Sequence, residues 1–223
     1  MTEAGKNTSE PMRLLVFGGS GKTGRHMVEQ ALERGHTVTA ALRDAGRLSV
    51  NHPNLEIVEG ALDDAAFLGK VTAKGFDAAV STLGIPHMGD ATPLADMTRV
   101  IVDALEAQHI ERFVCMTSLG CGESAGQGTW ITGLIQRTGL KYILRDKEVQ
   151  EEVIRNSKLR WTLLRPARLV SKVSKGKIIR WEGSPPDRRI KWEVSFAEAA
   201  EQMLAMLSDP GSVYKGIQIA KSA

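Results

Sequence analysis

The chain has 223 residues, of which 42% are hydrophobic and 25% are charged, as in ordinary globular proteins and unlike disordered or fibrous ones. Its 29 basic and 26 acidic residues leave a formal net charge of +3, which is too small to indicate a nucleic-acid partner. No apolar run approaches the roughly 20 residues of a membrane span, and the first residues contain no apolar leader. We therefore expect a cytoplasmic protein, monomeric or homodimeric, that binds neither nucleic acid nor membrane.

Short apolar runs alternate along the chain with segments of helical spacing. Strands are predicted at residues 12–17, 37–42, 55–59, 76–82, 112–117 and 161–165. Helices are predicted at residues 23–34, 92–109, 141–157 and 195–207, where Thr92-Pro93 and the pair Ser195 and Glu198 resemble helix starts. This alternation predicts right-handed β-α-β units. The expected fold class is α/β: a single domain over residues 12–223 with a doubly wound parallel sheet and helices on both faces, preceded by a disordered arm at residues 1–11.

Two segments interrupt this pattern. Residues 119–134 are rich in Gly, Ser and Thr and contain Trp130, and residues 168–194 are basic and contain prolines. Ligands of parallel sheets bind beyond the carboxyl ends of the strands, so we expect both segments to be loops on the substrate side. Trp130 is interpreted either as part of a lid over the site or as an anchor for its own loop.

A glycine-rich loop directly follows the first predicted strand. Gly18, Gly21 and Gly24 have the spacing G-x-x-G-x-x-G, which permits a tight turn, a close approach to a pyrophosphate and close packing of helix on strand. The following helix presents free N–H groups and a partial positive charge to the phosphates. A nucleotide-hydrolase P-loop would require glycine where the chain has Val16. A turn without any ligand is the remaining alternative.

The end of the second predicted strand indicates which dinucleotide binds. NAD-specific folds have an acidic residue about 20 residues after the loop, whereas NADP-binding folds have arginine. The strand ends at Arg43, followed by Asp44, with Arg47 four residues after Arg43. We interpret the two arginines as ligands of a 2′-phosphate, which arginine can bind bidentately. The alternative is two solvated loop arginines.

The chain resembles the atypical short-chain dehydrogenase/reductases. The resemblance lies in LLVFGGSGKTGRHMVEQALERGHTVTAALRDAGRL, in RFVCMTSLG at residues 112–120 and in DKEVQEEVIRNSKLRWTLLRPARL. Within that group the chain is similar to the NAD(P)H-binding family that includes biliverdin-IXβ/flavin reductase. The resemblance extends over about residues 12–207 and implies a Rossmann-like fold with NADP(H) as cofactor.

The resemblance also implies roles for individual residues. The cofactor-binding residues that it implies are Gly18, Ser20, Gly21, Lys22 and Thr23 at the pyrophosphate, Ala61 and Leu62 at the adenine, Leu83 and Gly84 at the ribose, and Thr117, Pro166 and Ala167 towards the nicotinamide. The implied substrate contacts are Leu119, Trp130 and Arg168. The chain departs from the family at Ala61, where an aspartate is usual, and at Arg168, where a small residue is common.

The expected catalytic residues are Ser118 and Lys147. In relatives with a complete site, a serine acts with a tyrosine and a lysine four residues after that tyrosine. Lys147 occupies the lysine position, but Ile143 occupies the tyrosine position, and Tyr142 is displaced by one residue, about 100° around a helix. We expect Ser118 to orient the nicotinamide or the substrate and Lys147 to bind the ribose. The alternatives are a strand-terminating serine and a solvated lysine.

The missing tyrosine favours acceptors that need mainly a bound hydride donor, such as flavins, quinones or bilin-like compounds. We therefore expect an NADPH-dependent reductase; the alternative is a non-catalytic NADP(H)-binding regulator. Residues 165–191 carry nine basic and two acidic residues, interpreted either as a solvated sheet edge or as a surface that attracts a planar, anionic substrate. The scattered histidines indicate no metal site, Cys115 is expected in the core, and Cys121 is a candidate reactive thiol.

Overall fold

The computed structural model describes residues 10–85, 89–127, 141–172, 175–187 and 189–223, so most of the proposed arm at residues 1–11 and Trp130 lie outside the described residues. The parallel strands are β1 (Arg13–Phe17), β2 (Thr37–Leu42), β3 (Leu55–Glu59), β4 (Ala78–Ser81), β5 (Arg112–Met116), β6 (Arg160–Pro166) and β11 (Lys215–Ser222). The helices are α1 (Lys22–Glu33), α2 (Ala65–Thr72), α3 (Pro93–Ala107), α5 (Lys141–Arg155) and α6 (Phe196–Leu207). None of these helices is long and apolar enough to cross a bilayer.

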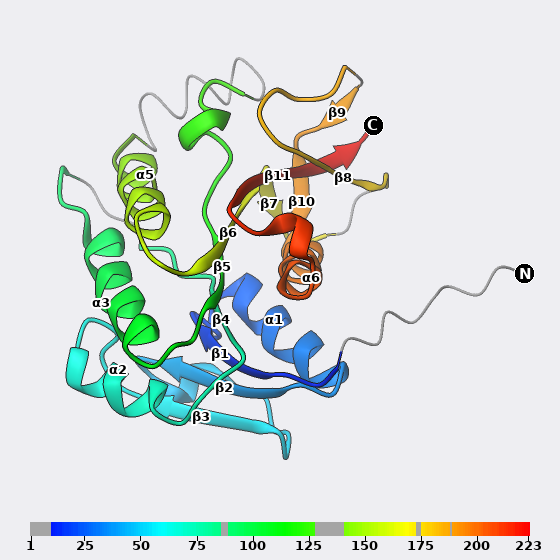
Figure 1. Ribbon diagram of the computed structural model, residues 1–223. Coiled ribbons are helices and arrows are strands. Elements are labelled where there is room, and N and C mark those ends of the chain that lie inside the picture. The colour runs from blue at the N-terminus through cyan, green and yellow to red at the C-terminus, as the bar shows by residue number, and fades with distance from the viewer. Residues whose placement is uncertain (1–9, 86–88, 128–140, 173–174, 188) are drawn as a thin grey trace, which may run out of the picture.

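The strands form a nine-stranded sheet in the order β3-β2-β1-β4-β5-β6-β11-β8 (Figure 1), with β9 (Ile190–Lys191) also paired to β11. β8 (Ile178–Trp181) and β9 run antiparallel to β11. β7 (Arg168–Val170) and β10 (Glu193–Ser195) form a separate parallel pair. The predicted doubly wound α/β architecture is confirmed, and the correction is that one edge of the sheet is antiparallel.

Side chains of the central strands are buried on both faces of the sheet. In β1, Leu14 and Val16 pack on one side and Leu15 and Phe17 on the other. α1 and α6 cover the first side, and α2, α3 and α5 cover the second (Figure 1). Burial on both faces explains why the central strand β1 is a short continuous apolar run instead of an alternating pattern.

The strand order reverses beside β1. The chain proceeds from β1 outwards through β2 and β3, and then returns to place β4 on the other side of β1. A crevice is expected at the carboxyl ends of two strands whose connections diverge in this way. Gly18 follows β1 and Thr82 follows β4, so the glycine loop lies at this point.

Several elements were not predicted. α2 follows an N-cap at Asp64, whose carboxylate accepts hydrogen bonds from the backbone N–H groups of Ala66 at 2.8 Å and Phe67 at 3.3 Å; this cap was the available signal. The short strands β7 to β10 were missed because basic residues and prolines break the apolar pattern there. β11 was missed because its isoleucines alternate with Gly216 and Gln218 and form no continuous apolar run. The capping box of Ser195 and Glu198 at the start of α6 is confirmed.

The N-terminus of α3 is capped differently from the expectation. Thr92 occupies the N-cap position, but its side chain makes no capping hydrogen bond. Instead Asp146, a buried residue of α5, accepts hydrogen bonds from the N–H groups of Leu94 at 3.0 Å and Ala95 at 2.9 Å. A carboxylate from the neighbouring helix thus satisfies the first turn of α3 and joins the two helices.

This arrangement predicts unequal effects of two substitutions on stability. Asp146→Ala removes the partner of two buried N–H groups, so the free energy of unfolding should fall by about 1–3 kcal/mol. Thr92→Ala removes no capping bond and should change it by less than about 0.5 kcal/mol. Urea unfolding followed by circular dichroism measures both. An equal loss in the two variants would contradict the assignment of Asp146 as the cap.

Candidate functional site

The glycine loop makes a compact turn between β1 and α1. Gly18 has a φ of +80°, a conformation that favours glycine, and its carbonyl oxygen accepts hydrogen bonds from Gly21 N at 3.0 Å and Thr82 Oγ1 at 3.1 Å. A Cβ added to Gly24 would lie 2.0 Å from Gly18 O. Helix α1 can therefore approach the strand only because this residue has no side chain, and its first turn faces the crevice with Gly21 as the N-cap.

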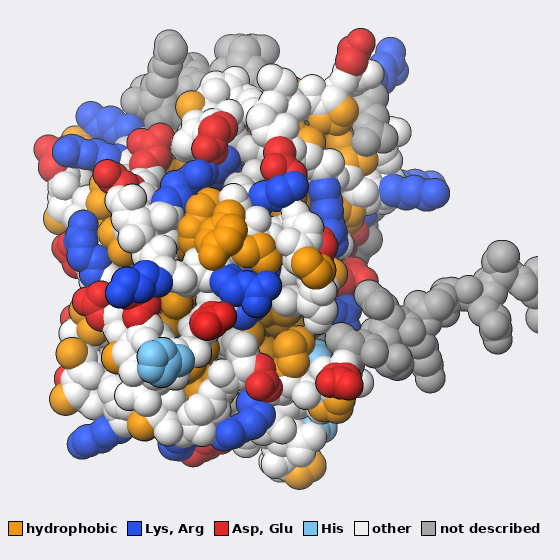
Figure 2. Space-filling model, viewed as in Figure 1, with side chains coloured by type: hydrophobic (Ala, Val, Ile, Leu, Met, Phe, Trp, Pro, Cys, Tyr) orange, Lys and Arg blue, Asp and Glu red, His pale blue; other side chains and the backbone are white. Residues whose placement is uncertain are grey.

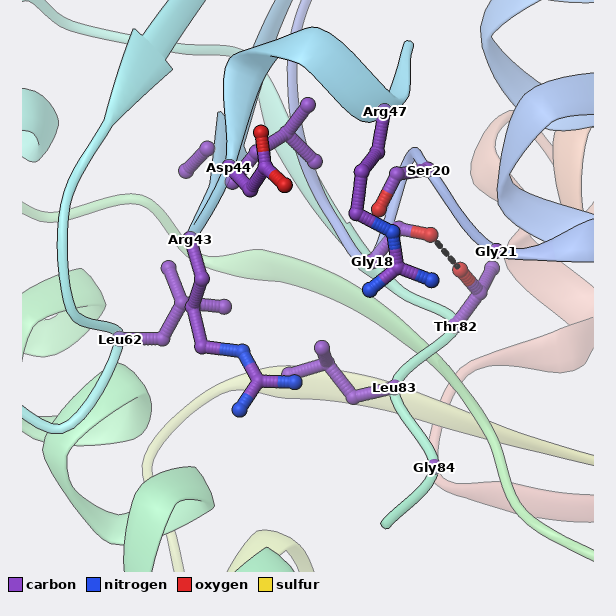
Figure 3. A pocket seen from close by; sticks show the side chains of 12 residues that line it. Gly18, Ser20, Gly21, Arg43, Asp44, Arg47, Leu62, Thr82, Leu83 and Gly84 are labelled. Carbon is purple, nitrogen blue, oxygen red and sulfur yellow. Dashed lines mark hydrogen bonds between the residues drawn. The ribbon is translucent and has the colours of Figure 1, made fainter.

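A first cavity of about 180 Å³ lies between the glycine loop and the carboxyl ends of β2 and β4. Its lining residues are Gly18, Ser20, Gly21, Ala41, Leu42, Arg43, Asp44, Arg47, Leu62, Thr82, Leu83 and Gly84. Figure 3 shows both guanidinium groups directed into it, that of Arg47 towards the glycine loop and that of Arg43 towards Leu83. The Asp44 carboxylate accepts a hydrogen bond from Gly46 N at 3.0 Å, which ties it to its own turn.

A second cavity of about 380 Å³ lies at the carboxyl ends of β4, β5 and β6. Its lining residues are Thr82, Leu83, Gly84, Met116, Thr117, Ser118, Leu119, Leu144, Lys147, Pro166, Ala167, Arg168 and Leu169. The wall is largely apolar, and its charged side chains are those of Lys147 and Arg168. Residues Thr82, Leu83 and Gly84 also line the first cavity, so the two cavities adjoin at the carboxyl ends of the strands, and we refer to them together as the groove.

Most of the predicted site residues lie along this groove. The exceptions are Ala61, which is exposed and outside both linings, Thr23, which is buried, and Lys22. The Lys22 ammonium lies 5.3 Å from the centre of the Phe196 ring and borders a neighbouring hollow with Arg25. The glycine cradle and the two arginines fit a phosphate-bearing dinucleotide at the first cavity, and the apolar second cavity fits its planar ring.

Helix α5 contributes Leu144 and Lys147 to the second cavity. These residues are three positions apart and so share one face of the helix. Neither Ile143 nor Tyr142 is among the described lining residues, and the Tyr142 ring packs under the Lys141 ammonium at 4.5 Å. The residue that faces the cavity one turn before Lys147 is thus Leu144. The family's four-residue spacing between tyrosine and lysine had led instead to Ile143. Met116, Leu169 and Thr82 were missed as well.

The two hydroxyl groups after β5 have different partners. Ser118 is partly exposed in the cavity wall, and its Oγ donates to the carbonyl of Leu119 at 3.1 Å. Thr117 is buried, and its Oγ1 donates to Glu151 Oε1 at 2.6 Å. Ser118 therefore presents the more accessible hydroxyl to a bound ring, while the Thr117 hydroxyl is held by a carboxylate of α5.

The basic segment is less charged at its surface than its composition suggests. Arg165 is fully buried and forms ion pairs with Glu151 and Glu123; burial lowers its pKa, but these two carboxylates outweigh that effect and raise it. Arg168 pairs with Glu193 at 2.8 Å, and Lys191 pairs with the same carboxylate at 3.1 Å. Counting Arg165 with the surface charges was wrong.

The surface charges in Figure 2 are mixed. On the face drawn there, acidic and basic side chains are interspersed around a central group of hydrophobic ones. Nucleic-acid-binding proteins instead cluster lysine and arginine along one face or helix. The observed distribution on this face agrees with the small net charge of +3.

Both cysteines belong to the protein interior. Cys115 is buried as predicted, and Cys121 is buried as well. Burial raises the pKa of each thiol to about 12. A thiol is nucleophilic as its thiolate, so the interpretation of Cys121 as a reactive residue was wrong: its loop folds into the core.

Comparison with known proteins finds related sequences. Residues 18–210 match a protein family described as NAD(P)H-binding. An uncharacterized chloroplastic protein of Arabidopsis thaliana is 27% identical over 228 residues, which cover 98% of this chain and 80% of that protein. An isoflavone reductase homolog of Zea mays is 31% identical over 114 residues, covering 47% of this chain and 35% of that protein.

Solved structures share the fold over nearly the whole chain. An anaerobilin reductase of Escherichia coli O157:H7 superposes with a TM-score of 0.77 at 23% identity, covering 94% of this chain and 97% of that one. A short-chain dehydrogenase/reductase of Veillonella parvula in complex with NADP has a TM-score of 0.77 at 17% identity and covers 94% of each chain. At these identities the similarity shows the fold.

Proposed function

Because the chain belongs to the NAD(P)H-binding family, we propose that it is an NADPH-dependent reductase that transfers hydride to a flavin, a quinone or a similar conjugated acceptor. The observation that supports the proposal is the pair of adjoining cavities, in which a cavity lined by two arginines shares Thr82, Leu83 and Gly84 with a larger apolar cavity. This sequence of environments, cationic and then apolar, matches the two ends of NADPH.

The cationic end supports a preference for NADPH over NADH. Arg43 and Arg47 extend from the end of β2 and the turn after it, where the adenosine ribose of a dinucleotide binds in this architecture. Their guanidinium groups can bind a 2′-phosphate bidentately. Ser20 and the backbone N–H groups at the start of α1 would hold the pyrophosphate, and Leu62 would contact the adenine.

The apolar end supports hydride transfer. NADPH supplies the hydride when bound; the protein binds, orients and excludes water. Pro166 and Ala167 would provide an apolar surface for the nicotinamide, Lys147 would donate hydrogen bonds to its ribose, and Ser118 would orient the ring or the acceptor. Leu119, Leu144 and Leu169 line the remaining wall and keep water from the reacting atoms.

The face of α5 supports the class of acceptor that we propose. Leu144 stands in the cavity wall and Ile143 at the usual tyrosine position, so that position provides no proton donor. A conjugated acceptor delocalises the charge that arrives with the hydride and can take its proton from solvent after it leaves the cavity. Lys147 and Arg168 are the charged groups of the described wall, which favours a planar acceptor that carries an anionic substituent.

The missing tyrosine equally suits a non-catalytic protein that binds NADP(H) and controls a partner. The decisive experiment follows NADPH absorbance with a panel of riboflavin, flavin mononucleotide and water-soluble quinones, alongside calorimetry with NADPH and NADP. We expect acceptor-dependent NADPH oxidation that is lost in Lys147→Met. Tight NADPH binding without turnover of any acceptor would favour the regulator, and the absence of dinucleotide binding would refute both functions.

A further inference from the structure

A group of charges centred on the buried Glu151 and Arg165 adjoins the second cavity, whose lining includes Thr117. Glu151 of α5 accepts hydrogen bonds from Thr117 Oγ1 at 2.6 Å and from Arg165 Nε at 2.9 Å. The Arg165 guanidinium also pairs with Glu123 at 2.7 Å between Nη1 and Oε2. The side chain of Arg165 is 0% exposed and that of Glu151 is 4% exposed. We call Thr117, Glu123, Glu151 and Arg165 the Glu151 cluster.

Each member of the Glu151 cluster adjoins a different part of the cavity wall. Thr117 precedes Ser118 at the end of β5, and Arg165 precedes Pro166 at the end of β6. Glu151 is four residues after Lys147 on α5, and therefore on the same face of the helix. Glu123 belongs to the segment that follows Leu119. The cluster thus joins both strand ends, the helix and the loop that form the wall.

The surroundings of Arg165 are shaped to admit its guanidinium group. A Cβ on Gly122 would lie 2.5 Å from Arg165 Nη2, and a Cβ on Gly216 would lie 2.9 Å from Nη1. Two glycines therefore leave the space that the group fills. Buried ion pairs are often no more stabilising than apolar residues of similar volume, so stability alone gives a weak reason for a charged cluster at this place.

We propose that the Glu151 cluster positions the nicotinamide end of the groove, with Glu151 fixing the ends of β5 and β6 against α5 and so setting the distances among Ser118, Lys147 and Pro166. This inference rests on the proposed function. Thr117 lines the second cavity itself, whereas the other three members are not among its described lining residues and act through their neighbours. Displacement of a reacting group by about 1 Å can lower a rate roughly 100-fold. No cluster member is among the described lining residues of the first cavity.

The chain offers a matched control for this role. Thr162 is buried in β6 and bonded to a buried arginine, receiving a hydrogen bond from Arg112 Nη2 at 2.8 Å. It lies near the amino end of its strand, whereas the cavity lies at the carboxyl end. Thr117→Val and Thr162→Val therefore each remove one buried hydroxyl from an arginine-containing cluster, towards opposite ends of two neighbouring strands.

The test compares these variants with Thr117→Ser, which keeps the hydroxyl. For Thr117→Val we expect kcat to fall roughly 10- to 100-fold while the Kd of adenosine 2′,5′-bisphosphate, which occupies only the first cavity, stays unchanged. Thr117→Ser should restore most of kcat. Thr162→Val should leave kcat unchanged, although its free energy of unfolding should fall about as much as that of Thr117→Val. Equal effects on kcat in Thr117→Val and Thr162→Val, or none in either, would overturn the proposal.

A second readout works without turnover. The fluorescence of reduced nicotinamide in bound NADPH reports the surroundings of the ring, and it should change in Thr117→Val but not in Thr162→Val. Unchanged fluorescence in Thr117→Val would refute the positioning role even if no acceptor is reduced. Wild-type protein that binds NADPH and reduces no acceptor would refute the reductase function alone, so the two failures are distinguishable.

Discussion

Arg43→Glu is expected to reverse the coenzyme preference, from NADPH bound well over about tenfold more tightly than NADH to NADH bound more tightly. Hydrogen bonds to charged groups contribute about 1.5–3 kcal/mol each, and each 1.4 kcal/mol changes an affinity about tenfold. The substitution removes a guanidinium group directed into the first cavity and introduces a carboxylate that would repel a 2′-phosphate and accept a hydrogen bond from a ribose hydroxyl. We expect the ratio of the two Kd values to change at least about 100-fold.

Fluorescence titration with both dinucleotides measures this ratio. Arg99→Glu serves as the control, because it makes the same change of charge on an exposed arginine of α3 that pairs with Asp96 at 2.7 Å, and it should leave the ratio unaltered. Equal Kd values for NADPH and NADH in the wild-type protein, or an unchanged ratio in Arg43→Glu, would show that the two arginines are merely solvated.

Gly24→Ala is expected to destabilise the protein and to weaken dinucleotide binding strongly. Replacing a glycine inside a helix by alanine ordinarily stabilises it by about 0.5–1 kcal/mol. Here the added Cβ would lie 2.0 Å from Gly18 O and 2.7 Å from Thr82 Oγ1, so α1 must move away from the glycine turn. We expect a loss of about 1–3 kcal/mol in the free energy of unfolding, as for other overpacked sites.

Gly69→Ala provides the comparison. Gly69 also lies inside a helix, α2. Apart from its chain neighbours and the backbone of its own helix, no atom lies within 4 Å of an added Cβ. This variant should be stabilised and should bind NADPH normally, whereas Gly24→Ala should bind it at least about tenfold more weakly, a difference of 1.4 kcal/mol. Thermal unfolding and calorimetry measure both effects. Two variants that respond alike would show that the turn tolerates the extra methyl group.

The sequence predicts those parts of the fold that depend on local pattern. β1 is a continuous apolar run, and the glycine loop has a spacing with a direct physical meaning, so the arginines beyond β2 could be placed near it. Interactions between distant segments were not predictable: Asp146 caps a helix that begins some 50 residues earlier along the chain. The burial of Arg165 likewise depends on Glu151 and Glu123, which only the folded chain brings together.

The arrangement of the candidate site depends on tertiary packing in the same way. Family spacing located Lys147, but the side chain that accompanies it in the wall is set by how α5 rotates against the sheet, and that side chain is Leu144. Lys22 was placed by its position in the loop, whereas its ammonium lies over the Phe196 ring of α6, far along the sequence. Local chemistry identifies which strand ends matter, and tertiary packing decides which side chains reach the groove.

The wall shared by the two cavities has a consequence for ligands of different length. A molecule that spans both cavities must cross Thr82, Leu83 and Gly84, so its two halves are tethered at a fixed separation. Once one half is seated, the other samples its own cavity at a high effective concentration, and the joined molecule binds far more tightly than either fragment. An inhibitor that fills only one cavity must therefore displace a ligand whose affinity is raised by the tether between its two halves. A linked compound that fills both cavities would gain the same increase in affinity.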